Sequence, residues 1–139
     1  MSESKTTGGC TCGAIRYEFS GQPAIVFNCH CHACQKATGN AFVSGAVVPD
    51  ANFKFTSGEP VYHTSQGDSG RNINRGFCAR CGTHVATTLD KRPGIIAMTL
   101  GSLDNPAAFK PQMNFYTAHA LPWVVIGDDT KNFPGEMTR

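Results

Sequence analysis

Seven cysteines are the residues of this 139-residue chain best suited to chemistry, and they occur in three tight groups. The groups have the spacings C-x-C, C-x-C-x-x-C and C-x-x-C, and their members are Cys10 and Cys12, then Cys29, Cys31 and Cys34, then Cys78 and Cys81. Thiolates separated by one or two residues can reach a common ion, and soft ions such as zinc prefer them. Buried free cysteine acting as a small hydrophobe would explain one or two thiols, but not three groups. The spacing therefore predicts metal binding.

Disulfide bonding is the first alternative for so many cysteines. An odd number of cysteines leaves one thiol without a partner. The chain opens with the polar sequence MSESKTTGG, which lacks the apolar segment of a signal peptide. We therefore expect a cytoplasmic protein, in a reducing compartment where disulfides are rare.

Seven thiolates divide most naturally into one set of four and one set of three. A closed four-thiolate zinc site is structural, whereas three protein ligands leave a position for water or substrate, as in catalytic zinc sites. The contiguous group from Cys29 to Cys34 is the better candidate for the three-ligand site. The two remaining pairs would then form the closed site, and we expect about two zinc ions per chain.

A histidine could instead complete the second site, because His30 and His32 alternate with the cysteines of the middle group. A residue directly between two chelating thiols usually points away from their metal. The three-thiolate set is favoured for this reason, and ligation by one of these histidines stays open.

Short runs with β-type patterns must position these ligands. In Ala14–Phe19, for example, every second residue is apolar, which is typical of a half-buried strand. The strand candidates are Ala14–Phe19, Ala24–Phe27, Phe42–Val48, Asn52–Thr56, Val61–Thr64, Thr83–Leu89, Ile95–Leu100 and Asn114–Ala118. Turns rich in Gly, Asn, Asp and Pro separate them, and one helical turn is expected at Ala33–Thr38, before Gly39. The prediction is a mainly β fold, with residues 1–7 as a frayed tail.

Composition limits the function classes. The length fits a single domain, and 40% apolar residues suffice for a core. Twelve basic and ten acidic residues give a net charge of +2, which makes a nucleic-acid partner improbable on electrostatic grounds. The apolar runs are far shorter than the roughly 18 residues that span a bilayer, so no membrane association is expected.

Five segments together resemble the glutathione-dependent formaldehyde-activating enzyme family, whose domain is shared with centromere protein V. They are GGCTCGAIRYEF (8–19), NCHCHACQKATGNAF (28–42), RGFCARCGTHV (75–85), GSLDNP (101–106) and ALPWV (120–124). The resemblance covers residues 8–133 and leaves residues 1–7 and 134–139 as tails. It implies a compact zinc-bearing β-tent of short antiparallel strands. It also implies a structural site at the two cysteine pairs and a catalytic site at Cys29, Cys31 and Cys34, the same division as ligand counting gives.

Three positions depart from the family pattern. Asn114 stands where relatives often have histidine, His119 where a small polar residue is common, and Gln35 where arginine is frequent. These departures concern the substrate rather than the metal ligands, because all seven family cysteines have a match here.

The resemblance implies a zinc-dependent carbon–sulfur lyase or synthase. Its substrates would be adducts of glutathione, or a similar thiol, with formaldehyde or another small aldehyde. Lys36 and Arg75 lie close in sequence to the two predicted metals, where each could bind a carboxylate of the thiol substrate or be simply solvated. His63 and His84 lie in strand-like runs and are expected to be ordinary surface or core residues.

Two other classes of protein share some of these sequence features. A zinc-stabilised binding module, for a protein, a nucleic acid or a thiol adduct, could also use C-x-x-C pairs, but the near-neutral charge and the seventh thiol argue against it. A redox enzyme of the methionine sulfoxide reductase B type would need a nucleophilic cysteine late in the chain, and none follows Cys81. The enzyme hypothesis is favoured over both.

Overall fold

The computed structural model describes residues 4–137 of the chain, and strands are the main regular structure in it. The strands are β1 (Lys5–Gly9), β2 (Arg16–Ser20), β3 (Ile25–Cys29), β4 (Val43–Pro49), β5 (Phe53–Ser57), β6 (Val61–Gln66), β7 (Asn72–Phe77), β8 (His84–Leu89), β9 (Ile95–Thr99), β10 (Met113–Phe115) and β11 (Lys131–Asn132). One α-helix, α1 (His32–Thr38), follows β3, and short 3-10 turns connect other elements. The mainly β, single-domain prediction is confirmed.

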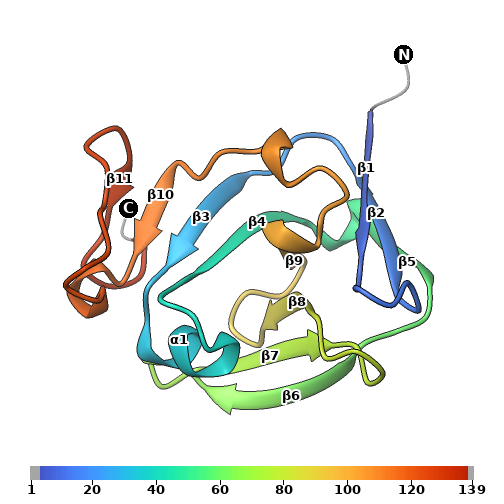
Figure 1. Cartoon of the computed structure of the whole chain (residues 1–139), viewed down its shortest axis with the longest axis horizontal. Coiled ribbons are helices and arrows are strands. Elements are labelled where there is room, and N and C mark those ends of the chain that lie inside the picture. The colour runs from blue at the N-terminus through green and yellow to red at the C-terminus, as the bar shows by residue number, and fades with distance from the viewer. Residues whose placement is uncertain (1–3, 138–139) are drawn as a thin grey trace.

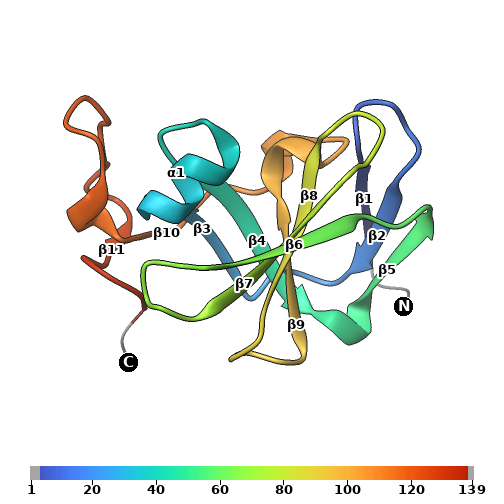
Figure 2. The ribbon, with the colours of Figure 1, turned by 90° about the horizontal axis from the view of Figure 1, so that it is seen from below.

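The strands form two sheets (Figure 1). The small sheet has the order β1-β2-β5, and the large sheet has the order β11-β10-β3-β4-β9-β8-β7-β6. All pairs are antiparallel except that β10 runs parallel to both β3 and β11. Seen from below, the small sheet stands at one end of the molecule and the C-terminal strands at the other (Figure 2).

Each of the eight strand candidates overlaps an observed strand, and the helical turn predicted at residues 33–38 is α1. The last candidate is too long, because Tyr116 has a left-handed backbone with φ of 57° and Thr117–His119 forms a 3-10 turn. Strands β1, β7 and β11 were not predicted. Their sequences, KTTGG, NINRGF and KN, lack the apolar alternation of a half-buried strand.

The tails predicted from the sequence need correction. Residues 5–7 belong to β1, which pairs with β2, and so they are not frayed. Residues 1–3 and 138–139 lie outside the described part of the chain. Residues 134–137 are described and contact the domain: the backbone N–H of Tyr116 donates to the carbonyl of Gly135, and Arg71 forms an ion pair with Glu136 at 3.1 Å.

The hydrophobic core lies between the small sheet and one face of the large sheet. The period-two prediction for β2 holds, since Tyr17 and Phe19 are each 1% exposed. From the large sheet, alternate residues enter the core, among them Val26, Ala46 and Met98. Because successive side chains of a strand point to opposite faces, the residues between these line the other face of the large sheet. Among residues 4–137, no helix has the length and hydropathy needed to cross a membrane.

Candidate metal centres

The first centre consists of Cys10, Cys12, Cys78 and Cys81, here named the four-thiol cluster. All four sulfur atoms lie within 4.8 Å of one another, and the Sγ atoms of Cys10 and Cys12 are 3.6 Å apart. Those of Cys12 and Cys78 are 3.7 Å apart. A zinc ion bound tetrahedrally at about 2.3 Å from each sulfur requires sulfur–sulfur distances of about 3.8 Å. The cluster therefore fits zinc.

Two tight turns present these thiols. In one turn, the N–H of Gly13 donates to the carbonyl of Cys10, and in the other, the N–H of Gly82 donates to that of Cys78. Both glycines have φ near 80°, a conformation that other residues seldom adopt. Hydrogen bonding of Cys81 to the Thr83 hydroxyl and backbone lowers the pKa of Cys81 to about 5, which favours the thiolate that a metal requires.

The four-thiol cluster joins distant parts of the fold. One turn connects β1 to β2 in the small sheet, and the other connects β7 to β8 in the large sheet (Figure 1). The sequence predicted that these two pairs combine, and the structure brings them together.

The second centre consists of Cys29, Cys31 and Cys34, here named the three-thiol cluster, with all three sulfurs within 4.8 Å of one another. Cys29 ends β3, Cys31 is the N-cap of α1, and Cys34 lies in its first turn. The backbone N–H of Cys34 donates to the Cys31 sulfur at 3.2 Å. The helix ends at Gly39, whose left-handed φ of 71° lets its N–H bond the carbonyl of Gln35. The end of β3 and the start of α1 therefore set the positions of all three thiols.

Neither neighbouring histidine ring joins the three-thiol cluster. His30 is 1% exposed, its Nε2 lies 2.8 Å from Oδ1 of Asn114, and its ring packs against Phe42. His32 points outward, beside Asp68 and His119. Asn114 therefore orients His30. The histidine-completed site that the sequence left open finds no support in the described residues.

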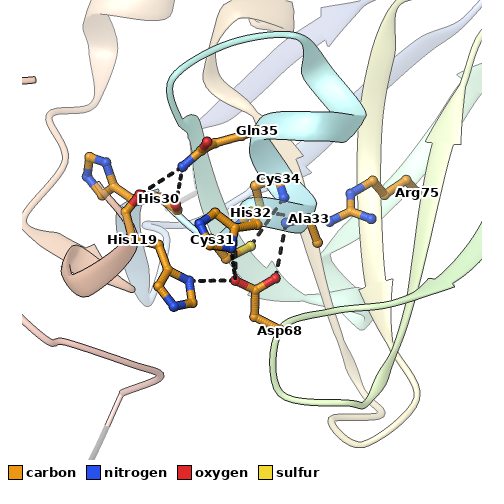
Figure 3. Close-up of polar contacts among 9 residues, drawn as sticks. All are labelled: His30, Cys31, His32, Ala33, Cys34, Gln35, Asp68, Arg75 and His119. Atoms are coloured by element: carbon orange, nitrogen blue, oxygen red, sulfur yellow. Dashed lines mark hydrogen bonds and ion pairs between the residues drawn. The ribbon is translucent and has the colours of Figure 1, made fainter. Parts of the chain in front are cut away.

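A positively charged side chain contacts the three-thiol cluster (Figure 3). Nη2 of Arg75 donates to Sγ of Cys34 at 3.7 Å, and Nη1 donates to the Ser65 hydroxyl at 3.1 Å. The neighbouring thiols of Cys29 and Cys31, together with the Arg75 charge, lower the pKa of Cys34 to about 3. The thiols of Cys31 and Cys34, together with burial, raise the pKa of Cys29. Without metal, Cys34 is thus the first of the three to ionise.

The structure changes the interpretation of the two predicted substrate cations. Arg75 was predicted from its closeness to Cys78, but its guanidinium lies at Cys34, in the other cluster. Lys36 is exposed on α1 and is not one of the described residues that surround the space next to the three-thiol cluster.

Comparison with known proteins identifies the family of this chain. A family model described as glutathione-dependent formaldehyde-activating enzyme matches residues 5–119. The chain belongs to this family. A crystal structure of a Rhodobacter sphaeroides protein has a similar fold, with a TM-score of 0.57 and 20% sequence identity. The match covers 76% of this chain and 97% of that chain.

In this member of the glutathione-dependent formaldehyde-activating enzyme family, the three-thiol cluster opens into a cavity of about 240 Å³. The face of the large sheet that lies opposite the core lines most of it, with apolar side chains from β3, β4, β7, β8, β9 and β10. This cavity was not expected from the sequence. A signal existed in Ile95–Thr99 and Ile25–Cys29, which are apolar at consecutive positions, as expected of strands covered on both faces.

His84, expected from the sequence to be an ordinary surface or core residue, lines the same cavity. Its Nε2 lies 2.9 Å from the Thr87 hydroxyl. Burial, and then the charge of Arg75, lower the pKa of His84, so its imidazole is neutral at neutral pH. His63, by contrast, is exposed on β6, as predicted.

A third group of side chains fastens the start of α1 and is here named the Asp68 clamp (Figure 3). The Asp68 carboxylate accepts hydrogen bonds from the backbone N–H of His32 at 2.9 Å and of Ala33 at 3.1 Å. Its Oδ2 also lies 2.6 Å from Nδ1 of His119. The amide of Gln35 donates to the carbonyls of both His30 and His119. Gln35 and His119, two of the departures from the family pattern, therefore act together at this helix.

Proposed function

We propose that this chain is a zinc-dependent carbon–sulfur lyase that makes and breaks adducts of glutathione, or a similar thiol, with an aldehyde. In the synthetic direction, a C–S bond forms as the C=O π bond breaks, and the thiol proton ends on the new hydroxyl. The reverse reaction restores the thiol and the aldehyde. The observation that carries the proposal is a cluster of only three thiols at the wall of a cavity.

The two clusters have different proposed roles. The four-thiol cluster fills all four positions of a tetrahedral zinc, which is the pattern of a structural site. The three-thiol cluster leaves one position open, which is the pattern of a catalytic site. Bound there, zinc supplies a soft Lewis acid that favours a substrate thiolate as the fourth ligand and lowers the pKa of that thiol.

The surrounding residues supply charge, proton transfer and a dry environment. Arg75 offsets the negative charge of the thiolates through its contact with Cys34. His84 is the residue that we assign to proton transfer, because it lines the cavity and is neutral at neutral pH. It takes up the proton of the substrate thiol and returns it to the carbonyl oxygen. The apolar sheet face limits access of water to the adduct.

The proposed reaction needs reduced cysteines in both clusters. The described structure has all seven as free thiols. The cytoplasm keeps thiols reduced, and we propose that the protein works there.

Exchange spectroscopy tests the proposed reaction. Exchange of ¹³C-formaldehyde between free aldehyde and its glutathione adduct can be followed by NMR with the zinc-loaded protein present. We expect exchange to accelerate in proportion to the protein added, and the acceleration to vanish with Cys34→Ser. Binding of the adduct without faster exchange would contradict catalysis and would make the protein a zinc-stabilised binding module.

A further inference from the structure

The cavity beside the three-thiol cluster has an apolar floor and a charged rim. The floor consists of half-buried side chains on one face of the large sheet, including Ile25, Phe27, Val47, Ile95 and Ala97. Arg75, on β7 beside Cys34, is the one charged residue that the strands of the floor contribute to the described lining. The other charged residues come from segments outside the strands: Asp68 and Arg71 between β6 and β7, Lys91 and Arg92 between β8 and β9, and Glu136 near the C-terminus. Such a division suits a ligand with an apolar part inside and a polar part at the mouth.

Apolar side chains lie next to the three-thiol cluster on strand β3. Cys29, Phe27 and Ile25 follow one another on one face of β3, over about 13 Å of strand. Gly45 on the neighbouring strand makes room for the Phe27 ring, because a Cβ there would lie 2.8 Å from its Cζ. A ligand whose sulfur lies at the three-thiol cluster therefore has an apolar surface next to the atoms bonded to that sulfur.

The volume of the cavity is too large for formaldehyde alone. A cavity of about 150 Å³ in another protein holds benzene, whereas this one has about 240 Å³. Glutathione does not suit the floor either, because Arg75 is one cation for its two carboxylates and the strands of the floor offer no carboxylate to its ammonium group. The remaining component of the adduct is the substituent that the aldehyde carries.

We propose that the aldehyde substrate of this protein carries an apolar substituent of about six to eight carbon atoms, which fills this cavity. The inference rests on the proposed function and specifies the substrate class. The reacting carbon lies between the sulfur and this substituent, so the cavity selects the aldehyde while the polar thiol component stays at the charged rim.

Stable thioethers test the inference without turnover. Calorimetry on the zinc-loaded full chain would compare S-methyl-, S-butyl- and S-hexylglutathione, in which carbon is bonded to the same sulfur as in the adduct. We expect binding to tighten about fourfold for each added methylene that the cavity buries. Equal affinity of the three conjugates would overturn the inference and leave the proposed function standing.

A pair of variants locates the effect. Ala97→Phe puts a ring on the cavity floor, and Ala107→Phe makes the same change on an exposed turn outside it. We expect Ala97→Phe to remove the advantage of the hexyl over the methyl conjugate and Ala107→Phe to keep it. A hexyl advantage that survives in folded, zinc-loaded Ala97→Phe would overturn the assignment to this cavity.

Free alkanethiols separate the two sources of an apolar group. If 1-hexanethiol binds and no glutathione conjugate does, the apolar group belongs to the thiol and the aldehyde assignment is wrong. Binding of neither probe would overturn both the inference and the proposed function. If affinity rises with alkyl chain length among the glutathione conjugates and 1-hexanethiol does not bind, the result supports both the inference and the proposed function.

Discussion

At the residue scale, the contact between Arg75 and Cys34 sets the electrostatics of the three-thiol cluster. Zinc competes with protons for thiolates, so a group that lowers a thiol pKa strengthens zinc binding at a given pH. Arg75 adds to the lowering of the Cys34 pKa that the neighbouring thiols cause.

Arg75→Gln removes this charge and should weaken the three-thiol site in mild acid. The pKa of Cys34 rises without the guanidinium, so protons displace the metal at a higher pH than in the wild type. Zinc content after dialysis between pH 5 and 8 measures the shift. Arg92→Gln removes an exposed arginine at the cavity rim and serves as control. Identical zinc-release curves for Arg75→Gln and the wild type would contradict the electrostatic role.

His84→Gln tests the proton-transfer assignment. Proton transfer by one side chain contributes about 10² to 10⁴ in rate, so adduct exchange should slow by at least about 10²-fold. Zinc content should stay at the wild-type value, because the His84 ring is not grouped with either thiol cluster. His63→Gln, on the exposed strand β6, is the matched control. Equal rates for the two variants would show that His84 carries no proton.

At the element scale, the Asp68 clamp holds α1 against the segment between β6 and β7. Burial alone would raise the pKa of Asp68, but hydrogen bonds from the backbone N–H of His32 and Ala33 and from His119 outweigh it and leave the pKa lowered. A carboxyl whose folded pKa is lowered stabilises the fold above its unfolded pKa. That stabilisation is lost as pH falls through the folded value.

Asp68→Asn keeps the size of the side chain and removes its charge. We expect a loss of about 1.5–3 kcal/mol in the free energy of unfolding at pH 7, typical of a hydrogen bond to a charged group. The difference from the wild type should shrink as pH falls below about 4, where the unfolded carboxyl protonates. Urea unfolding of the wild type and of Asp68→Asn measures this difference in the free energy of unfolding. Asp128→Asn, at an exposed position, is the control. A difference independent of pH would contradict the charge-based clamp.

Local elements were predictable from the sequence, and their spatial neighbours were not. Alternation identified β2, and Gly39 marked the end of α1 at the position observed. Strand β7 was not predicted because its sequence is polar. The contact of Arg75 with the Cys34 thiol, 41 residues away in sequence, was therefore not predicted either. The structure brings the cysteines together in the two groups that ligand counting proposed, because metal chemistry limits how thiols can be combined. No such chemical rule pairs Asp68 with His119 in the sequence, because only the folding of the sheet brings their two segments together.

At the scale of the whole molecule, the two clusters occupy different kinds of position. The four-thiol cluster connects the turn of the small sheet to a turn of the large sheet, 66 residues apart between Cys12 and Cys78. The three-thiol cluster closes only the short segment between β3 and α1. Loss of the first should therefore affect folding, and loss of the second should affect chemistry.

Cys81→Ser and Cys34→Ser test this difference. Zinc binding supplies on the order of 10 kcal/mol in small structural sites, comparable to the roughly 5–15 kcal/mol stability of a whole domain. Cys81→Ser should therefore be partly unfolded or insoluble. Cys34→Ser should stay folded and keep about one zinc ion in the four-thiol cluster. Thermal melting and zinc content measure both, and equally severe unfolding of the two variants would contradict the proposed roles.

Cobalt substitution with glutathione titration tests the central claim, that the three-thiol cluster holds a metal with a position open to a substrate thiol. Cobalt in thiolate sites reports its ligands through visible d–d bands. We predict that glutathione changes these bands with saturation at one equivalent per chain, and that Cys34→Ser abolishes the change. Bands that stay constant at millimolar glutathione in the fully loaded wild type would contradict the claim.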